Sequence, residues 1–318
     1  MKVYTHIPAR GIPKGPRVLA IGVFDGVHLG HQAIFKRVRQ RAKALNGPSA
    51  VLTFDPVPET VIAPERAPLA LTSLDQKLRL IGDCGMDCAF VVRFDRRFAA
   101  LSPEDFVAKL LVARLGVREV VVGSDFVFGA RAQGDTALLK RLGSAAGFKV
   151  HVVGPRRVGG KRVSSTLIRQ AVASGKMAAA ARMLGRPFSL SGAVIRGDGI
   201  GAKLGYPTAN LDLEQELLPP SGVWGGRARV LPAGAWIAAL ANLGERPTFK
   251  GKEFRTEVHL LDFKGNLYGK RLEAELRFRL RPEKRFKDAG ALIEQIRLDE
   301  SRFRRTQALH SVSRNSGG

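Results

Sequence analysis

One stretch decides the fold of the first half of the chain: Ala20-Ile-Gly-Val-Phe-Asp-Gly-Val-His-Leu-Gly-His31. Residues 18–23 are mainly apolar and have the length of a strand, Asp25-Gly26 is a turn signal, and a helical pattern begins at Leu29. The stretch therefore predicts a buried strand, a tight turn and the start of a helix, in that order.

The predicted helix start has the properties of an anion-binding site. Its first backbone N–H groups have no partner within the helix, and the positive end of the helix dipole faces the turn. His28 and His31 are three residues apart, so both project from one face and could donate to phosphate oxygens. Glycine leaves room for a ligand at three positions: Gly22, Gly26 and Gly30. The alternative is that each histidine is an ordinary surface or core residue and the glycines only shape a turn.

The rest of the first half alternates between strand and helix patterns. Short apolar runs predict strands at 49–54, 88–92, 119–123 and 149–153. Helical spacing predicts helices at 32–45, 74–81, 102–115 and 136–142. This alternation indicates a doubly wound α/β fold whose parallel sheet binds ligands at the carboxyl ends of its strands.

The stretch Val163-Ser-Ser-Thr-Leu-Ile-Arg169 follows the last of these strands and a basic turn at 156–162. Hydroxyl groups at a helix start, together with free N–H groups, suit phosphate oxygens. Arg169 lies about one turn after Thr166 and could hold a phosphate with two hydrogen bonds. A plain helix cap followed by a surface arginine is the alternative.

The sequence pattern changes after the linker signal Gly185-Arg-Pro-Phe188. Short alternating runs predict an antiparallel barrel or sandwich, with strands at 189–194, 225–231, 235–241, 255–262 and 272–279. A helix over 289–304 should close this half, and we expect residues 311–318 to be disordered. The predicted domains are therefore residues 1–185 and 186–310.

The chemistry of the second half is concentrated in Gly197-Asp-Gly-Ile-Gly-Ala-Lys-Leu-Gly-Tyr-Pro-Thr-Ala-Asn210. Its glycines allow close approach of the backbone to phosphates, and Pro207 stiffens the segment that follows. Alternation places Thr208 and Asn210 on one side, where their neutral oxygens suit an Mg²⁺ ion already bound to ATP phosphates. Taken alone, a glycine-rich turn of this kind is more often only a loop.

These motifs resemble a known family. The pattern His28-x-Gly30-His31 is similar to the signature of the nucleotidylyl transferase superfamily, and Phe24-Asp25-Gly26 before it resembles the adenylyltransferase module of bacterial bifunctional riboflavin kinase/FAD synthetases. The string Gly205-Tyr-Pro-Thr-Ala-Asn210 resembles riboflavin kinases. The resemblance covers about residues 15–306, with Val57 and Ile200 departing from the family pattern.

The resemblance implies that riboflavin is phosphorylated to FMN and that FMN is adenylylated to FAD, each with ATP and Mg²⁺. It implies catalytic roles for His28, His31, Arg169 and Glu257, the last as the base of the kinase. Nucleotide contacts in the adenylyltransferase would come from Gly22, Phe24, Asp25, Gly26, Gly30, Asp125, Ser164, Ser165 and Thr166. In the kinase they would come from Gly197, Gly199, Gly201, Lys203, Thr208 and Asn210, the last two also as metal ligands.

Two of these roles have strong alternatives. Asp125 follows a predicted strand and could simply cap or turn its own loop. Glu257 could form an ion pair with Arg255 or His259, two residues away on the same face of a strand. Without the resemblance, the ion pair would be the preferred interpretation of Glu257.

Composition bounds the remaining possibilities. The net charge of +24 suits anionic ligands, but the basic residues are dispersed and the chain has only 2 Trp and 3 Tyr, which disfavours a nucleic-acid surface built on stacking aromatics. An adenylyltransferase fused to a non-catalytic barrel is a second alternative. The 2 cysteines lack partners for a zinc site, and no apolar run is long enough to cross a bilayer. We expect a cytoplasmic enzyme.

Overall fold

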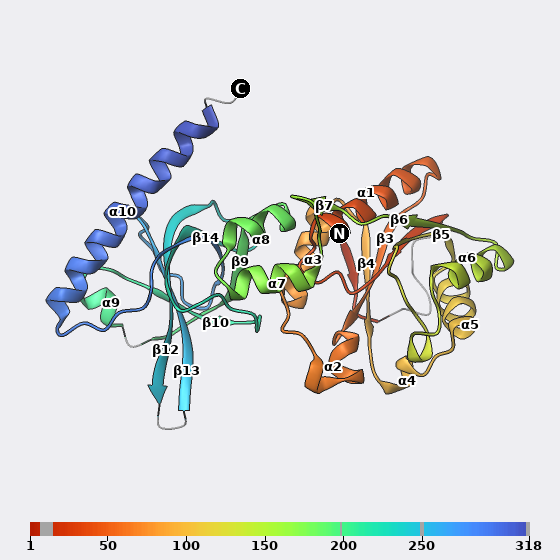
Figure 1. The fold of residues 1–318 in the computed structure, drawn as a ribbon, viewed down its shortest axis with the longest axis horizontal. Coiled ribbons are helices and arrows are strands. Elements are labelled where there is room, and N and C mark those ends of the chain that lie inside the picture. Colours follow the sequence, from red (N-terminus) through yellow and green to blue (C-terminus); the bar gives the residue numbers. More distant parts are fainter. Residues whose placement is uncertain (7–14, 198, 249–250, 316–318) are drawn as a thin grey trace. The chain divides into compact units, whose positions relative to one another are not determined.

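The computed structural model describes the backbone of residues 1–6, 15–197, 199–248 and 251–315, and leaves the side chains of 200, 203, 245–248, 251–253 and 308–315 undescribed. The chain forms two compact units (Figure 1). The first contains Met1–Leu167 and Met183–Gly185, and the second contains Ile168–Arg182 and Arg186–Gly318. We expected the boundary at Gly185. The observed division instead groups residues 168–182 with the second unit.

A parallel sheet forms the centre of the first unit. Its strand order is β1-β4-β3-β2-β5-β6, and every neighbouring pair is parallel, which confirms the doubly wound fold. The strands are β1 (Lys2–Tyr4), β2 (Arg17–Ile21), β3 (Ser49–Asp55), β4 (Cys88–Arg93), β5 (Val117–Gly123) and β6 (Lys149–Val153). The sequence analysis missed β1, a three-residue strand, because so short a segment shows no periodicity.

Helices cover both faces of this sheet. Val18 and Ala20 of β2 belong to one buried cluster, while Leu19 and Ile21 belong to another, as expected when a strand is buried on both sides. The long helices of the first unit are α1 (Leu29–Ala44), α3 (Leu74–Asp83) and α6 (Thr136–Ala145), together with a π-helix at Phe106–Arg114. Short helices lie at α2 (Pro58–Ile62), α4 (Arg96–Ala99) and α5 (Pro103–Asp105), and 3₁₀ turns at Pro64–Arg66 and Ala130–Ala132.

A buried ion-pair network joins α1 to β5. Glu119 is 3% exposed, and its carboxylate accepts hydrogen bonds of 2.7 Å from Nε and from Nη2 of Arg41. The same carboxylate lies 2.7 Å from Nε2 of His151. The hydrogen bonds from Arg41 are the main reason that the pKa of Glu119 is lowered to about 2. The network ties the C-terminal end of the helix that carries His31 to the central sheet.

The second unit contains a closed antiparallel barrel, which confirms the barrel and excludes the sandwich. Its strands follow one another in the order β10-β13-β12-β11-β14-β9. They are β9 (Phe188–Ile195), β10 (Ala209–Leu213), β11 (Gly222–Val230), β12 (Ile237–Thr248), β13 (Gly251–Leu260) and β14 (Arg271–Arg281). The expected strands correspond to β9 and β11–β14, whereas β10 was assigned only to the loop motif.

The second unit contains most of α7 (Ser165–Ala173), which starts in the first unit, and most of α8 (Met177–Leu184), which ends in it, together with α9 (Ile200–Lys203) and α10 (Ala289–Asn315). Helix α10 continues past the expected end at Arg304 as far as Asn315, so residues 311–315, which we expected to be disordered, are helical. Residues 316–318 lie outside the described part of the chain.

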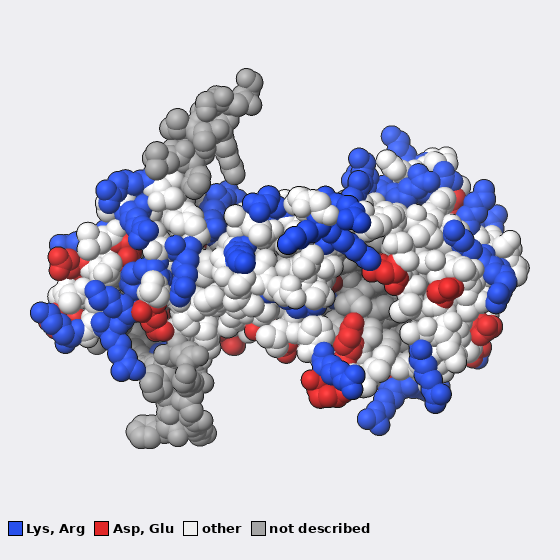
Figure 2. Space-filling model, in the orientation of Figure 1, with Lys and Arg blue, Asp and Glu red and all other residues white. Residues whose placement is uncertain are grey.

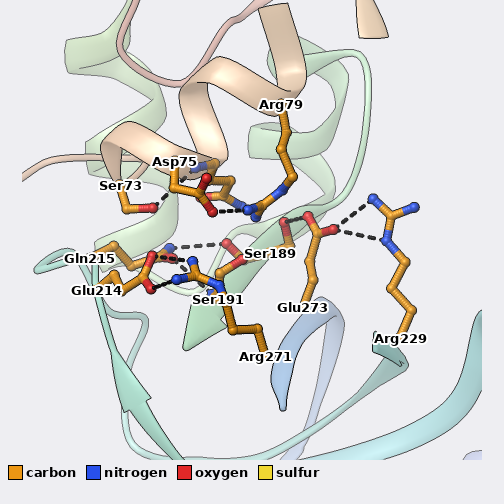
Figure 3. A network of polar contacts seen from close by, with 11 residues as sticks. Ser73, Asp75, Arg79, Ser189, Ser191, Glu214, Gln215, Arg229, Arg271 and Glu273 are labelled. Atoms are coloured by element: carbon orange, nitrogen blue, oxygen red, sulfur yellow. Dashed lines mark hydrogen bonds and ion pairs between the residues drawn. The ribbon is translucent and has the colours of Figure 1, made fainter. Parts of the chain in front are cut away.

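Polar side chains tie neighbouring strands of the barrel together (Figure 3). The carboxylate of Glu273 in β14 accepts from Arg229 of β11 at 2.7 Å and from the Ser189 hydroxyl of β9 at 2.8 Å. Gln215 donates to the Ser189 carbonyl and accepts from the Ser191 N–H, each at 3.0 Å. These bonds add side-chain links between β9, β11 and β14, and between β9 and the segment after β10, to the backbone pairing of the strands.

Basic side chains are scattered over the face drawn in Figure 2 and are interspersed with acidic ones. On that face they do not gather into a single stripe, in keeping with the dispersion read from the sequence. Among the described residues, no helix is both long and apolar enough to cross a membrane.

Candidate functional site

The first candidate site lies where the order of the parallel strands reverses. Strand β2 is hydrogen-bonded to β3 on one side and to β5 on the other. Residues 22–28 connect the carboxyl end of β2 to α1, which makes this turn the topological switch point where such sheets bind ligands. The stretch predicted to bind nucleotide therefore occupies the expected place.

His28 is the N-cap of α1. Its Nδ1 accepts from the N–H of Gly30 at 3.1 Å and from that of His31 at 3.4 Å. Because Nδ1 is the acceptor, a neutral His28 carries its proton on Nε2 and can donate from that atom. The two N–H groups are already used by this cap, so the expectation that they are free to bind an anion is wrong for both of them.

The glycines of the turn make room for the protein's own side chains. A Cβ atom on Gly30 would lie 2.9 Å from Cε1 of His28, and one on Gly22 would lie 3.0 Å from the Phe24 ring. Gly26 has a φ of +77°, and its Cβ would lie 2.8 Å from Leu71. Glycine is needed here for internal packing, whereas the sequence analysis assigned it to ligand approach.

His31 stacks on His28, with 3.6 Å between ring centroids and 19° between ring planes. The buried Phe24 ring and the His31 ring form a T-shaped pair with 5.2 Å between centroids, so Phe24 supports a histidine from within the core. Burial, followed by the proximity of His28 and Lys77, lowers the pKa of His31 well below its ordinary value, and the ring is neutral. Nδ1 of His31 is buried with no hydrogen-bond partner among the described residues.

Asp25 is buried and holds the turn against the segment before α3. Its carboxylate accepts from the N–H of Leu71 at 3.0 Å and from the N–H of Thr72 at 3.2 Å. The Thr72 hydroxyl is 3.2 Å from the same carboxylate and accepts from the N–H of Gly26 at 3.2 Å. Asp25 therefore shapes the turn from inside.

Two of the three predicted hydroxyl residues bond to the protein. The hydroxyl of Ser165 donates to the Asp25 carbonyl at 3.0 Å, which brings the start of α7 to the turn. The hydroxyl of Ser164 accepts from the N–H of Leu167 at 3.3 Å, as a helix cap does. Thr166 is exposed. Arg169 lies one turn further along α7, in the segment grouped with the second unit.

Asp125 forms an exposed ion pair with Arg162, whose Nη2 lies 2.6 Å from its carboxylate. Asp125 lies in the loop after β5, and Arg162 lies in a short hairpin, β7 (Arg157–Val158) and β8 (Lys161–Arg162). The sequence analysis did not pair these residues, although the basic turn at 156–162 was a visible signal.

The second candidate site is a row of polar residues across three strands of the barrel. Asn210 of β10 is paired with Glu257 of β13, and Glu257 is paired with Asn242 of β12. Residues paired across antiparallel strands have side chains on the same face. The sequence analysis missed Asn242, because only the register of the sheet brings it beside Glu257.

The glycine-rich loop packs closely against this row. A Cβ on Gly197 would lie 2.2 Å from Nδ2 of Asn210, and a Cβ on Gly201 would lie 2.4 Å from the Tyr206 carbonyl oxygen and 3.2 Å from Oγ1 of Thr208. Gly199 has a φ of +69° with open space around it. The side chain of Lys203 lies outside the described residues.

One of the two ion-pair partners considered for Glu257 is engaged elsewhere. Nδ1 of His259 donates to the Pro207 carbonyl at 2.8 Å, and its ring packs on Tyr206 with 5.8 Å between centroids. These contacts fix the segment that leads into Thr208.

The described residues contain no cluster of three or more His, Cys, Asp and Glu side chains suited to a metal ion. The neutral oxygens of Thr208 and Asn210 fit instead a cation that arrives with phosphate oxygens as its other ligands. Asn210 lies in the row with Glu257, so such a cation would be near a carboxylate.

Comparisons with known proteins find a family match for each half of the chain. The family described as FAD synthetase matches residues 13–167, and the family described as riboflavin kinase matches residues 184–307. A bifunctional riboflavin kinase/FMN adenylyltransferase from Escherichia coli is 42% identical over 91% of this chain and 92% of its own length. One from Haemophilus influenzae, with the same name, is 37% identical over 91% of this chain and 96% of its own length.

A solved structure, described as a macrolide-efflux protein from Streptococcus pneumoniae, has the same fold. The TM-score is 0.82 at 27% identity, and the match covers 96% of this chain and 99% of that one. The fold, the two sites and the likeness over nine-tenths of the sequence agree: this chain belongs to the family of bifunctional riboflavin kinase/FMN adenylyltransferases.

Proposed function

We propose that the chain phosphorylates riboflavin to FMN with one ATP and adenylylates FMN to FAD with a second ATP, releasing pyrophosphate. The observation that supports this most directly is that the two family matches, 13–167 and 184–307, do not overlap. The first covers His28 and His31, the second covers Asn210 and Glu257, and Arg169 lies between the two matches. Each reaction therefore has its own polar centre on its own scaffold.

In the adenylyl transfer, a phosphate oxygen of FMN attacks the α-phosphate of ATP. This oxygen is already anionic, so the step needs no base and no covalent enzyme intermediate. Catalysis then consists of positioning and charge stabilisation, with the Nε2–H of His28 donating to a phosphate oxygen in the transition state. His31, Arg169 and Thr166 would supply further contacts to the phosphates.

In the phosphoryl transfer, the 5′-hydroxyl of riboflavin attacks the γ-phosphate of ATP. A neutral alcohol needs a base, and Glu257 would accept its proton. Thr208 and Asn210 would hold the Mg²⁺ ion that neutralises charge on the phosphates. The close packing of Gly197 and Gly201 sets the position of these two side chains.

The proposed ligands are riboflavin, FMN and ATP, with Mg²⁺ as the cation. Kinase and adenylyltransferase domains use ATP, generally with a divalent metal, and Mg²⁺ is the specific choice because it takes few protein ligands and keeps its phosphate contacts. Because both reactions consume ATP, we also propose a cytoplasmic location. Nucleic acid is not a partner in this proposal.

The test separates the two reactions. Purified protein is incubated with riboflavin, ATP and Mg²⁺, and the flavins are followed by chromatography. His28→Ala combined with His31→Ala should stop FAD formation while FMN accumulates, and Glu257→Gln should stop FMN formation while added FMN is still converted to FAD. The exposed residues His6 and Glu294 offer matched controls, His6→Ala and Glu294→Gln, which should retain both activities.

Loss of both activities in either variant would contradict independent sites. If the unchanged protein makes FAD from added FMN but never phosphorylates riboflavin, the barrel is not a kinase and the second half of the proposal is wrong.

A further inference from the structure

A buried lysine lies beneath the turn of the first site. Lys77 is in α3 and is 4% exposed. Its Nζ donates to the carbonyl oxygen of Val23 and to that of Phe54, each at 3.3 Å. Val23 follows β2 and Phe54 is in β3, so this ammonium joins the ends of the two strands that meet beside the switch point. Removing a lysine from water costs free energy, so its presence here calls for a compensating role.

No carboxylate in the described part of the chain forms an ion pair with the Lys77 ammonium. Among the described residues, no carboxylate oxygen lies within 4.0 Å of Nζ. Asp25 and Asp55 act on it only from a greater distance, and burial lowers the pKa of Lys77. A buried cation without an ion pair keeps a positive potential at the carboxyl edge of the sheet, where the phosphates of a nucleotide would bind.

The turn above Lys77 is strained and needs to be held. Phe24 and Val27 are not glycines, yet their φ angles are +55° and +42°. Residues in this region persist only when the surrounding structure fixes them. The carboxylate of Asp25 holds the middle of the turn and the His28 cap holds its end, whereas Lys77 and Thr53 both donate to the carbonyl of Val23, at its beginning.

We propose that Lys77 is a positioning residue for adenylyl transfer, whose ammonium fixes the start of the strained turn through the Val23 and Phe54 carbonyls and supplies a fixed positive charge behind the histidine pair. The inference rests on the proposed function of this unit. Lys77 touches no reacting atom, and it acts through the turn and through His31.

The charge of Lys77 adds to the effects that lower the pKa of His31. Burial is the main reason for the low pKa of His31, followed by the stacked His28 and then by Lys77. The titratable groups around this arrangement are His28, which stacks on His31, and Asp25 and Asp55 near the ammonium. Removing the ammonium therefore shifts the pKa of His31 upward.

The test compares two substitutions of Lys77 with a matched one in the same unit. Lys77→Met removes both the charge and the donor, whereas Lys77→Gln removes the charge and keeps an N–H donor. Lys140→Met, on the exposed face of α6, is the control. FAD formation from added FMN is measured across a range of pH, with kcat and KM separated, and FMN formation from riboflavin is measured in the same preparations.

We expect Lys77→Met to lower the kcat of FAD formation at least tenfold while FMN formation changes less than twofold. Lys77→Gln should retain more activity than Lys77→Met, and in both variants the acid-side inflection of the rate profile should move to higher pH. Lys140→Met should change neither reaction.

Unchanged FAD formation in Lys77→Met would overturn the inference, as would equal loss of FAD and FMN formation, which would mean that Lys77 only supports the fold. An inflection that stays in place in Lys77→Gln would overturn the role of the charge. Failure of the unchanged protein to make FAD would instead contradict the proposed function of the unit.

Discussion

The two candidate sites obtain unusual backbone conformations in opposite ways. In the first, the non-glycine residues Phe24 and Val27 have φ angles of +55° and +42°, and buried polar side chains hold them in place. In the second, Gly199 and Gly205 have φ angles of +69° and +85°, and a Cβ atom added at either position would meet open space. The first turn is held by several buried hydrogen bonds at once, whereas the second loop leaves its backbone open to a ligand.

The largest effect is expected from a substitution that disrupts the second site alone. Gly201→Ala would place a Cβ 2.4 Å from the Tyr206 carbonyl oxygen, so the loop must move away from Thr208. We expect FMN formation to fall at least 100-fold, which corresponds to about 2.7 kcal/mol of transition-state stabilisation. Gly154→Ala, where a Cβ meets open space, is the control. FAD formation from added FMN should be unaffected in both, and retained FMN formation in Gly201→Ala would show that close packing of the loop is not required.

A second prediction concerns the rigidity of the first unit. Glu119→Gln removes the carboxylate that binds Arg41 and His151, and should lower the free energy of unfolding by about 2 kcal/mol near neutral pH. The pKa of Glu119 is lowered to about 2, so its contribution is present above the ordinary value of 4.5 and is lost as pH falls toward 2. Urea unfolding at several pH values measures the difference. A difference that is the same at pH 7 and pH 3 would contradict the assigned cause.

A third prediction separates the two roles of His28. His28→Ala removes the cap of α1 and should lower the free energy of unfolding by about 1 kcal/mol, whereas His28→Asn keeps a side-chain acceptor and should cost less than half of that. Both variants lack the Nε2 donor and should lose FAD formation. If His28→Asn retains FAD formation, then His28 serves only as a cap.

The smallest effect is expected at the exposed pair of Asp125 and Arg162. Asp125→Asn should change the free energy of unfolding by less than about 0.5 kcal/mol, because exposed ion pairs contribute little. We expect the KM for ATP or FMN in adenylyl transfer to rise severalfold if Asp125 contacts a substrate. Steady-state kinetics measures the KM, and thermal unfolding measures the stability. An unchanged KM would mean that Asp125 only forms the ion pair with Arg162.

The fold was predictable because periodicity marks buried strands and amphipathic helices. The strand before His28 and the alternation after it were sufficient for the parallel sheet, and the short runs after Gly185 were sufficient for the barrel. β1 and β10 were missed because one has three residues and the other lies within a motif that suggests a loop.

The candidate sites were predictable as motifs and not as contacts. The spacing of His28 and His31 placed them on one face, yet only the structure shows that His28 caps the helix and stacks on its neighbour. Lys77 gave no sequence signal, because a single lysine in a helix is ordinary. Asn242 begins a stretch that resembles the family, yet nothing local to it indicates that it lies beside Glu257. Long-range packing and strand register decide their positions, and neither can be read from a local pattern.

The row formed by Asn210, Glu257 and Asn242 has a consequence for how the second unit matures. Asn242 and Glu257 come from the consecutive strands β12 and β13, whereas Asn210 comes from β10, much earlier in the chain. The β12–β13 hairpin alone lacks Asn210, so a chain that has formed only this local pairing has an incomplete row. Phosphotransferase activity during refolding should therefore not appear before β10 has paired with β13.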